Sequence, residues 1–304
     1  MTGTYDVIVV GEGLAGLSAA NEAARCGART ASFEAVLFGG LVTNVTVLDP
    51  SPDAACASGA DLAAGLVGEN ADLGVHGVPE QVGALVREAD GWRVSTDSGT
   101  HRARAVIVAT GARLRALGVP GEAELTGRGV SSCADCDGPL HRGREVVVAG
   151  GGDSALQEAL VLAEFCARVH VINRGETFSA RPDLAARLAG HANVSVLHAT
   201  VIEAIDGRDG VQRVVLAGVR DGVRREIPCS GVFAYVGLEP NAAWLPEAVR
   251  RDPSGRVITD AALLSSAPGV YAAGAVRAGC GGTLADAIRD GRTAGRNAAA
   301  SRPG

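Results

Sequence analysis

Cys133 and Cys136 are the two residues of this sequence that are best suited to chemistry. Because two residues separate them, their sulfurs can close a small disulfide ring. One thiol can then act as the outer nucleophile while its neighbour exchanges electrons with a cofactor. Asp137 follows directly and could relay the proton that is needed when a thiolate becomes a thiol. The spacing therefore indicates a redox-active dithiol, with Cys133, Cys136 and Asp137 as candidate catalytic residues.

A zinc site and a redox-inert pair of core cysteines stay open at the level of the residues. Half of a zinc site would need a second pair of Cys or His nearby, and the closest histidine, His141, stands at the wrong spacing. An inert pair would simply pack in the interior. The remaining cysteines are scattered, and we expect them to be small buried apolar residues: Cys26, Cys56, Cys166, Cys229 and Cys280.

A glycine-rich turn near the N-terminus predicts a dinucleotide site. The run Tyr5–Val10 is typical of a buried parallel strand, and it leads into a turn of six residues and an Ala-rich helix. In such a turn the first glycine permits the bend, the second lets a pyrophosphate approach the helix N-terminus, and the third lets the helix pack on the strand. A following strand ends at Glu34, whose carboxylate can accept from ribose hydroxyls. The predicted contacts are Gly11, Gly13, Leu14, Ala15, Gly16 and Glu34.

A second strand–turn–helix unit repeats this design. The strand Glu145–Ala149 leads into a triple-glycine turn and a helix that continues to about Phe165. The next strand, Arg168–Ile172, ends at Asn173-Arg174 rather than at an acid. An arginine there can pair with a 2′-phosphate, so the pattern favours NADPH over NADH. The predicted contacts in this unit are Gly150, Gly152, Asp153, Ser154, Asn173 and Arg174.

Composition and motif order predict an α/β fold with two Rossmann-like dinucleotide-binding domains. A chain of 304 residues exceeds the usual size of a single core. Its 42 glycines and 3% aromatic residues suit tight turns between strands and helices. Pro120 and Gly237–Asn241 mark the joints. We expect residues 1–116 and 242–304 to form a discontinuous FAD-binding domain, and residues 117–241 to form an inserted NAD(P)-binding-type domain that carries the cysteine pair.

Charge and hydropathy argue against several partners. The net charge is −6 and no basic run occurs, so a nucleic acid or an acidic membrane has no electrostatic support. Apolar stretches such as Val7–Val10 are far shorter than the roughly 20 residues of a membrane span. The first residues lack the basic region of a signal peptide, so we expect a cytoplasmic protein.

The order of the motifs resembles bacterial low-molecular-weight thioredoxin reductase over essentially the whole chain. The segments that carry the resemblance are Gly39-Gly40, Ala109-Thr110-Gly111, Cys133–Gly138 and Phe233–Asn241. The resemblance implies a homodimer in which NADPH reduces FAD and FAD reduces the Cys133–Cys136 disulfide. Cys136 would lie against the flavin, Cys133 would attack the disulfide of a thioredoxin-like protein or a small molecule, and Asp137 would be the acid. It adds these predicted cofactor contacts: Gly40, Thr110, Gly111, Gly274, Ala275, Thr283 and Leu284.

A helix is expected to begin near Thr283, which can form a capping pair with Asp286. The positive charge of this helix N-terminus has the right sign for the anion that a reduced flavin carries over its pyrimidine ring.

Four motifs depart from the family pattern. The His-Arg-Arg…Arg signature for the 2′-phosphate reads Asn173–Ser179, and the terminal Ala-Gly-Asp reads Ala273-Gly274-Ala275. The family's Arg-Gln-Ala reads Gly282-Thr283-Leu284, and its Gly-Gly-Gln reads Gly39-Gly40-Leu41. Two alternatives therefore stand beside the reductase. One is a divergent enzyme that takes electrons from ferredoxin or another flavin, or that passes the electrons of a dithiol to oxygen. The other is a non-catalytic flavin-binding module.

Overall fold

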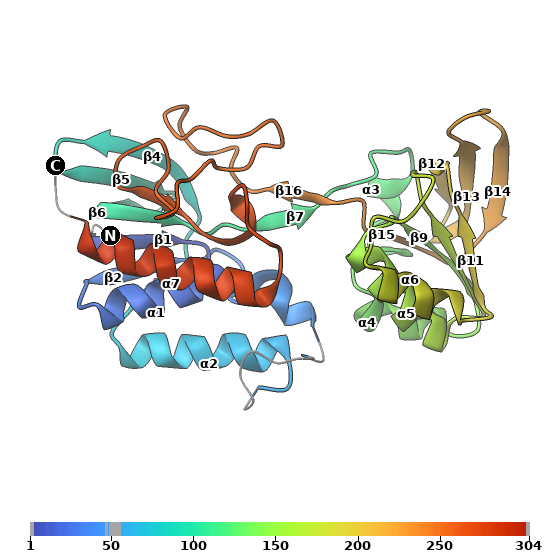
Figure 1. Ribbon diagram of the computed structural model, residues 1–304, viewed down its shortest axis with the longest axis horizontal. Helices are drawn as coiled ribbons and strands as arrows, with labels where there is room; N and C mark the ends of the chain where they lie inside the picture. Colours follow the sequence, from blue (N-terminus) through green and yellow to red (C-terminus); the bar gives the residue numbers. More distant parts are fainter. Residues whose placement is uncertain (1–2, 46–47, 49–55, 302–304) are drawn as a thin grey trace. The chain divides into compact units, whose positions relative to one another are not determined.

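The computed structural model describes residues 3–45, 48 and 56–301, and the chain divides into two compact units (Figure 1). The first unit comprises Met1–Arg113 and Glu239–Gly304, and the second comprises Leu114–Leu238. Both joints lie three residues before the positions expected from the sequence. The chain passes between the units through β7 (Ala112–Leu114) and β16 (Leu238–Pro240), which pair with each other.

Seven strands of the described chain form the sheet of the first unit. The strands are β1 (Gly3–Val10), β2 (Thr30–Phe33), β3 (His76–Val78), β4 (Val82–Glu88), β5 (Gly91–Thr96), β6 (Thr100–Val108) and β17 (Val270–Ala272). Their order is β3-β2-β1-β6-β5-β4, and β17 pairs with β6. The pairs among β1, β2, β3, β6 and β17 are parallel, whereas β4 and β5 form an antiparallel hairpin against β6.

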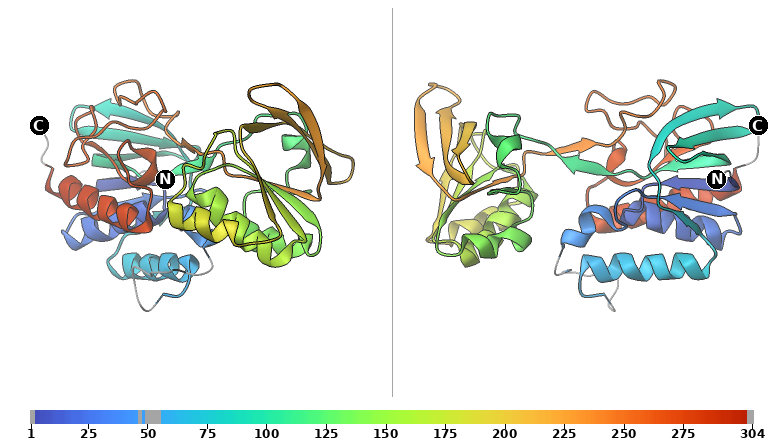
Figure 2. Two further views of the ribbon diagram at one scale, coloured as in Figure 1. Left: turned by 45° about the vertical axis from the view of Figure 1, so that its right-hand side comes forward. Right: turned by 180° about the vertical axis from the view of Figure 1, so that it is seen from behind.

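Helices cover one face of this sheet (Figures 1 and 2). They are α1 (Leu14–Arg25) and α7 (Leu284–Ala300), and a further helix, α2 (Gly59–Asp72), packs against α1 (Figure 1). Helices α1 and α7 pack on β1 through Val7 and Val9, which are fully buried, and each such side chain contributes about 1.5–3 kcal/mol when buried. The other face packs against the irregular segment 242–267. Two short 3₁₀ turns, η1 (Gly40–Asn44) and η3 (Gly274–Val276), complete the unit.

Glycines allow α1 and α7 to approach closely. A Cβ added at Gly291 would lie 2.2 Å from the Ala15 carbonyl oxygen, and one added at Gly295 would lie 2.4 Å from that of Ala19. Neither backbone atom can retreat without moving α1. These two positions therefore set the distance between the helices, and α1 is the helix that begins at the first glycine turn.

The second unit also has a parallel sheet, with the order β11-β10-β9-β15-β8. Its strands are β8 (Val130–Ser131), β9 (Glu145–Ala149), β10 (Arg168–Ile172), β11 (Val194–Leu197) and β15 (Gly231–Ala234). One face packs against α4 (Ala134–Asp137), α5 (Asp153–Phe165) and α6 (Pro182–Ala189). The 3₁₀ turn η2 (Gly138–His141) follows α4 directly.

The other face of this sheet packs against an antiparallel sheet of β12 (Thr200–Gly207), β13 (Val211–Gly218) and β14 (Arg224–Pro228) (Figure 2). The short helix α3 (Glu122–Leu125) contributes Leu125 to that layer.

The strand–turn–helix units predicted from the sequence are confirmed, as is the α/β fold class. Two antiparallel features were not predicted: the β4–β5 hairpin and the β12–β14 sheet. Cys166 and Cys229 are buried as expected, but the same expectation is wrong for Cys26, which is exposed, and for Cys56 and Cys280, which are half-buried. Within the described residues, no helix is both long and apolar enough to cross a bilayer.

The close contact between α1 and α7 yields a first prediction. Gly291→Ala should lower the free energy of unfolding by about 1–3 kcal/mol, because the new Cβ overlaps the backbone of α1. Gly68→Ala in α2 is the matched control: nothing lies within 4 Å of its added Cβ, so helix propensity should make it stabilising by about 0.5–1 kcal/mol. Urea denaturation measures the change in the free energy of unfolding in both variants. The same change in both would contradict a close contact between α1 and α7 at Gly291.

Candidate active site

The turn after β1 leaves room for a ligand at one of its three glycines. Gly11 has φ +98°, and a Cβ there would lie 2.5 Å from the Ala109 carbonyl oxygen. A Cβ at Gly16 would lie 1.8 Å from the Gly11 carbonyl oxygen. At Gly13, by contrast, the nearest atom would be the Gly39 carbonyl oxygen at 3.9 Å. Gly11 and Gly16 are thus required by the chain itself, whereas Gly13 keeps a surface open.

Gly13 is also the N-cap of α1, where no side chain within the described chain accepts a hydrogen bond from the first turn. N–H groups at such a position suit an anion such as pyrophosphate. Leu14 and Ala15 are the residues that carry them.

Glu34 lies beside this turn. Its Oε2 accepts from the Glu12 backbone N–H at 3.2 Å, and its Oε1 accepts from the Val36 N–H at 3.1 Å. The carboxylate is therefore held at the end of β2, close to the turn, where it can also accept from a diol. A cradle with no Cβ at Gly13 and a fixed carboxylate at its edge fits an adenine dinucleotide.

Three other predicted positions converge on the same turn. A Cβ at Gly40 would lie 3.4 Å from Gly13 Cα, one at Gly11 would lie 2.9 Å from Thr110 Cα, and one at Gly274 would lie 2.7 Å from Ala15 Cβ. The Thr110 hydroxyl donates to the Asn241 carbonyl at 2.7 Å, and Gly111 accepts from the Asn241 N–H at 3.1 Å. These two residues therefore tie the turn to the returning chain.

Sequence reasoning missed the buried ion pair that holds the Gly274 turn. Arg277 Nε and Nη2 bind the two carboxylate oxygens of Asp290 at 2.6 and 2.7 Å, and Asp290 Oδ2 accepts from the Gly274 N–H at 3.2 Å. The Asp290 side chain is only 4% exposed, and its hydrogen bonds raise the pKa of Arg277. Ala275, at the family's Asp position, carries no carboxylate, so Asp290 is the acid that fixes this turn. No local sequence motif predicts this ion pair, because its partners are 13 residues apart, one directly after η3 and the other on α7.

The capping box at the start of α7 is confirmed. Thr283 Oγ1 accepts from the Asp286 N–H at 3.1 Å, and Asp286 Oδ2 accepts from the Thr283 N–H at 3.2 Å. The Thr283 hydroxyl also donates to Asp286 Oδ2 at 2.8 Å, and this bond, with that from the Thr283 N–H and the contact with Arg289, lowers the pKa of Asp286. The carboxylate partly neutralises the positive helix end, while Leu284 packs with Leu14 and Leu17.

The second glycine turn is shaped by its neighbours in the second unit. A Cβ at Gly150 would lie 2.4 Å from the Tyr235 carbonyl oxygen, and Gly152 caps α5 without any side-chain hydrogen bond in the described chain. Asp153 pairs with Arg181 Nε at 3.0 Å, so Arg181 lies beside the turn with its charge already matched. Ser154, the next residue of α5, is exposed.

The side chains of the two residues after β10 differ in whether they can reach a ligand. The Asn173 side chain is buried: its Nδ2 donates to the Thr177 carbonyl at 2.9 Å and its Oδ1 accepts from the Gly175 N–H at 3.2 Å. Arg174 is exposed, and no carboxylate of residues 3–45, 48 and 56–301 pairs with it. Asn173 therefore shapes the loop, and Arg174 is the cation available to a ligand.

Cys133 and Cys136 form a disulfide with their Cα atoms 5.3 Å apart. Cys133 is the N-cap of α4, and its Sγ accepts from the Cys136 N–H at 3.2 Å. Cys136 is exposed and Cys133 is half-buried. Asp137 ends α4, and its N–H donates to the Cys133 carbonyl at 3.1 Å. All three predicted catalytic residues thus lie within one helical turn.

Two further groups at this helix were missed by sequence reasoning. Glu158 Oε2 accepts from the Ala134 N–H at 2.9 Å and from the Tyr235 hydroxyl at 3.0 Å. Burial raises the pKa of Glu158 and of Tyr235. An acid on the apolar face of α5, next to Ala155, Ala159 and Leu162, was the signal that could have revealed this contact.

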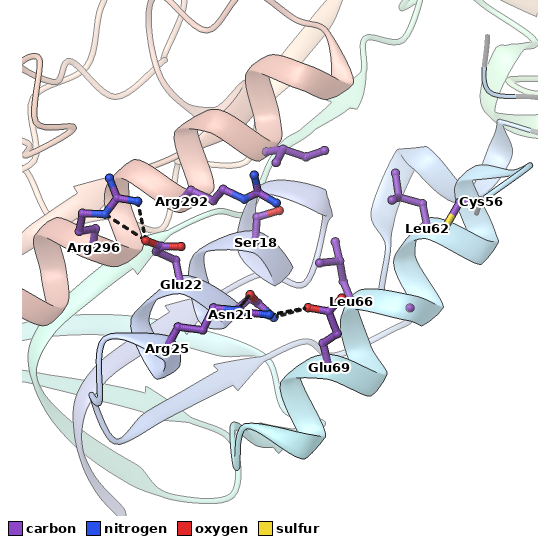
Figure 3. A pocket seen from close by; sticks show the side chains of 12 residues that line it. Ser18, Asn21, Glu22, Arg25, Cys56, Leu62, Leu66, Glu69, Arg292 and Arg296 are labelled. Atoms are coloured by element: carbon purple, nitrogen blue, oxygen red, sulfur yellow. Dashed lines mark hydrogen bonds and ion pairs between the residues drawn. The ribbon is translucent and has the colours of Figure 1, made fainter. Parts of the chain in front are cut away.

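A separate pocket of about 640 Å³ lies among α1, α2 and α7 in the first unit (Figure 3). Its charged side chains are largely matched: Arg25 pairs with Glu69 at 3.3 Å, and Arg296 pairs with Glu22 at 2.6 Å. None of the residues predicted to bind a cofactor lines it.

Comparison with known proteins agrees with the geometry of both turns. Residues 5–298 match the family described as pyridine nucleotide-disulphide oxidoreductase. The chain belongs to this family. It is 38% identical over 296 residues to a thioredoxin reductase of Treponema pallidum, covering 97% of this chain and 96% of that protein. It is 36% identical over 297 residues to a thioredoxin reductase of Listeria innocua, covering 97% and 92%.

Solved structures agree with this assignment. The thioredoxin reductase of Lactococcus lactis superposes with a TM-score of 0.91 at 33% identity, covering 97% of each chain. That of T. acidophilum superposes with a TM-score of 0.90 at 30% identity, covering 97% of this chain and 98% of that one. The pyridine nucleotide-disulphide oxidoreductases of this thioredoxin-reductase-like group use FAD and NADPH, and the open cradle at Gly13 and Glu34 fits FAD.

The difference between Gly11 and Gly13 yields a second prediction. Gly13→Ala should fold with unchanged unfolding free energy but lose roughly tenfold or more in FAD affinity, because its Cβ fills space that only a ligand needs. Gly11→Ala should instead destabilise the protein, since φ +98° and the Ala109 carbonyl oppose a side chain. Flavin content per chain and thermal unfolding of the apoprotein separate the two effects. Full flavin content in a well-folded Gly13→Ala variant would contradict the assignment.

Proposed function

We propose that this protein is a flavin-dependent disulfide reductase of the thioredoxin reductase type. Electrons pass from NADPH through FAD to the Cys133–Cys136 disulfide, and then to the disulfide of a thioredoxin-like protein or a small molecule. The observation that carries the proposal is the disulfide at the start of α4, in a chain that holds one dinucleotide turn in each unit. The first unit then binds FAD and the second binds the nicotinamide nucleotide.

The residues of α4 suit thiol exchange. Bound FAD supplies a two-electron carrier between a hydride donor and a disulfide. Reduction breaks the sulfur–sulfur bond and leaves two thiols once two protons are taken up, one of them through Asp137. A thiolate on Cys133 would keep the Cys136 N–H as its hydrogen-bond donor, 3.2 Å away in the disulfide, and such a contact favours the anion. This supports Cys133 as the nucleophile.

Exchange with the substrate follows from that arrangement. Cys133 attacks a substrate sulfur, forms a mixed disulfide and releases the first substrate thiol. Cys136 then attacks Cys133, restores the ring and releases the second thiol. Cys133 is half-buried and not fully buried, and Leu140, on the turn that follows α4, is 72% exposed, so the segment around the nucleophile is accessible to a partner.

For the nicotinamide nucleotide we propose NADPH, with Arg174 as the group that pairs with the 2′-phosphate. Its guanidinium follows β10 directly, as the position requires, and is exposed without an ion pair among the described residues. Gly150, Gly152, Asp153 and Ser154 would surround the pyrophosphate at the N-terminus of α5.

We also propose a homodimer, as the resemblance to bacterial thioredoxin reductases implies, and a cytoplasmic location. Cys26, Cys166, Cys229 and Cys280 are free thiols in the structure, which is compatible with a reducing compartment. Light scattering of the purified flavoprotein tests the dimer.

Removing one catalytic sulfur yields a third prediction. In an anaerobic titration, the wild-type protein should consume NADPH for both the flavin and the disulfide, whereas Cys133→Ser and Cys136→Ser should consume only the flavin equivalent. Disulfide-reductase turnover should fall at least a hundredfold. Cys26→Ser, which removes an exposed free cysteine, is the control and should titrate as wild type.

The same titration separates the proposal from its alternatives. Failure of both NADPH and NADH to bleach the flavin would overturn it. Peroxide formed from an added dithiol without any nicotinamide would point to the oxidase instead.

Replacing Arg174 yields a fourth prediction. Arg174→Gln should raise the KM for NADPH about ten- to a hundredfold, because a charge-assisted contact to phosphate is worth roughly 1.5–3 kcal/mol. The KM for NADH should stay the same. Arg187→Gln, on the last turn of α6, is the control. An equal effect on both nucleotides would contradict a role at the 2′-phosphate.

A further inference from the structure

Glu158 is a half-buried acid on an otherwise apolar helix face. It lies on α5 between Ala155, Ala159 and Leu162, each fully buried. A carboxylate in such a place is retained only if its oxygens are hydrogen-bonded. Both donors are known: the Ala134 N–H at 2.9 Å and the Tyr235 hydroxyl at 3.0 Å, each to Oε2. Glu158 is therefore bound to the segment that carries the disulfide.

The contact falls on the first residue after Cys133. Three N–H groups at the start of α4 have acceptors: that of Ala134 donates to Glu158, that of Cys136 donates to Cys133 Sγ, and that of Asp137 donates to the Cys133 carbonyl. One donor next to the sulfurs is thus occupied by a carboxylate and not by sulfur. The same carboxylate brings a negative charge to the side of α4 that faces α5.

We infer that Glu158 is a positioning residue for the disulfide, which fixes the first turn of α4 and, by its charge, disfavours thiolate in the reduced pair. The inference rests on the proposed function, because it concerns the reduced state of Cys133 and Cys136. Two electrons and two protons convert the disulfide into two thiols. A negative charge nearby raises the free energy of any form that keeps a thiolate. At a pH where one of the two thiols is ionised, the reduced pair is therefore less stable and donates electrons more readily.

The charge of Glu158 depends on the groups around it. Burial raises its pKa, the hydrogen bonds from Ala134 and Tyr235 lower it, and the charge of Asp135 raises it. Asp137 lies on α4 with Asp135. Its charge acts on His141, whose pKa is lowered by burial. Above its raised pKa Glu158 is anionic and opposes thiolate. As the pH falls through that pKa the opposition disappears.

The test is a thiol–disulfide equilibrium of the FAD-loaded protein in glutathione redox buffers. Trapping with maleimide and peptide mass spectrometry measure the fraction of reduced Cys133–Cys136 without any turnover. Glu158→Gln keeps an oxygen acceptor for the Ala134 N–H and removes the charge. At alkaline pH, where the reduced pair carries a thiolate, the equilibrium should shift about tenfold toward the reduced pair, which makes its reduction potential about 30 mV less negative. At acidic pH, where Glu158 is protonated, the reduction equilibrium of the variant should equal that of the wild-type protein.

Glu164→Gln is the matched control, since Glu164 is an exposed acid near the end of the same helix. It should leave the equilibrium unchanged at every pH. The rate of alkylation of the reduced pair gives a second readout, because only the thiolate reacts. The rise of this rate with pH should move to lower pH in Glu158→Gln and should stay in place in Glu164→Gln.

Tyr235→Phe provides an independent check should Glu158→Gln fold poorly. It keeps the Ala134 contact but removes a hydrogen bond that favours the carboxylate, so Glu158 should ionise at higher pH. A plot of the reduction potential of Cys133–Cys136 against pH should bend where Glu158 ionises. In Tyr235→Phe this bend should move to higher pH. A purely structural role for the pair would lower stability without moving that bend.

The outcomes separate this inference from the proposed function. If NADPH does not reduce the wild-type disulfide, the proposed function fails. If it does, and Glu158→Gln matches Glu164→Gln at alkaline pH, the inference is overturned. An unmoved bend in Tyr235→Phe overturns it as well.

Discussion

The close approach of strand and helix at a glycine turn is the constraint on which this structure depends. At the first turn the Gly11 carbonyl lies where a Gly16 side chain would be, so α1 can rest on β1 only without that side chain. The second turn repeats a different contact of the first: a Cβ at Gly150 would lie 2.4 Å from the Tyr235 carbonyl oxygen, as one at Gly11 would lie 2.5 Å from that of Ala109. Each turn ends at a glycine N-cap that has no side chain, and the N–H groups beyond it remain for an anion. One backbone solution thus creates both nucleotide sites.

Beside each glycine turn an ion pair fixes the neighbouring segment of the chain. In the first unit the Arg277–Asp290 pair holds the Gly274 turn. In the second unit Asp153 and Arg181 bind the loop after β10 to the start of α5. Breaking one partner of a buried pair such as Asp290 is strongly destabilising, because an uncompensated charge remains. These pairs fix the segments that lie beside the glycine turns.

The redox pair is governed by a different balance. The Cys136 N–H favours negative charge on the Cys133 sulfur, whereas the carboxylate of Glu158, bound to the Ala134 N–H, opposes it. A disulfide reductase needs both tendencies, since its nucleophile must be reactive and its reduced state must still release electrons. The placement of Glu158 on a helix that begins at the second glycine turn couples this balance to the nucleotide-binding scaffold of the same unit.

The sequence by itself determined the local elements and their roles. Strand–glycine–helix patterns predicted β1 with α1 and β9 with α5, and the Thr283–Asp286 pair predicted the start of α7. Such signals are readable because the interactions are between near neighbours in the chain. The cysteine spacing predicted the disulfide for the same reason. The resemblance to thioredoxin reductases extended these local patterns to the whole chain.

Only the tertiary structure decided which distant residues meet. Asp290 contacts Gly274, Glu158 contacts Ala134, and the Asn173 side chain turns inward while Arg174 stays free of ion pairs within the described chain. No sequence pattern indicated the β12–β14 sheet, because register shifts between β12 and β13 interrupt the alternation of apolar and polar residues. The contacts of Asp290 and Glu158 join residues that lie on different elements. Their geometry depends on how helices pack on sheets, and no pattern within a single element records it.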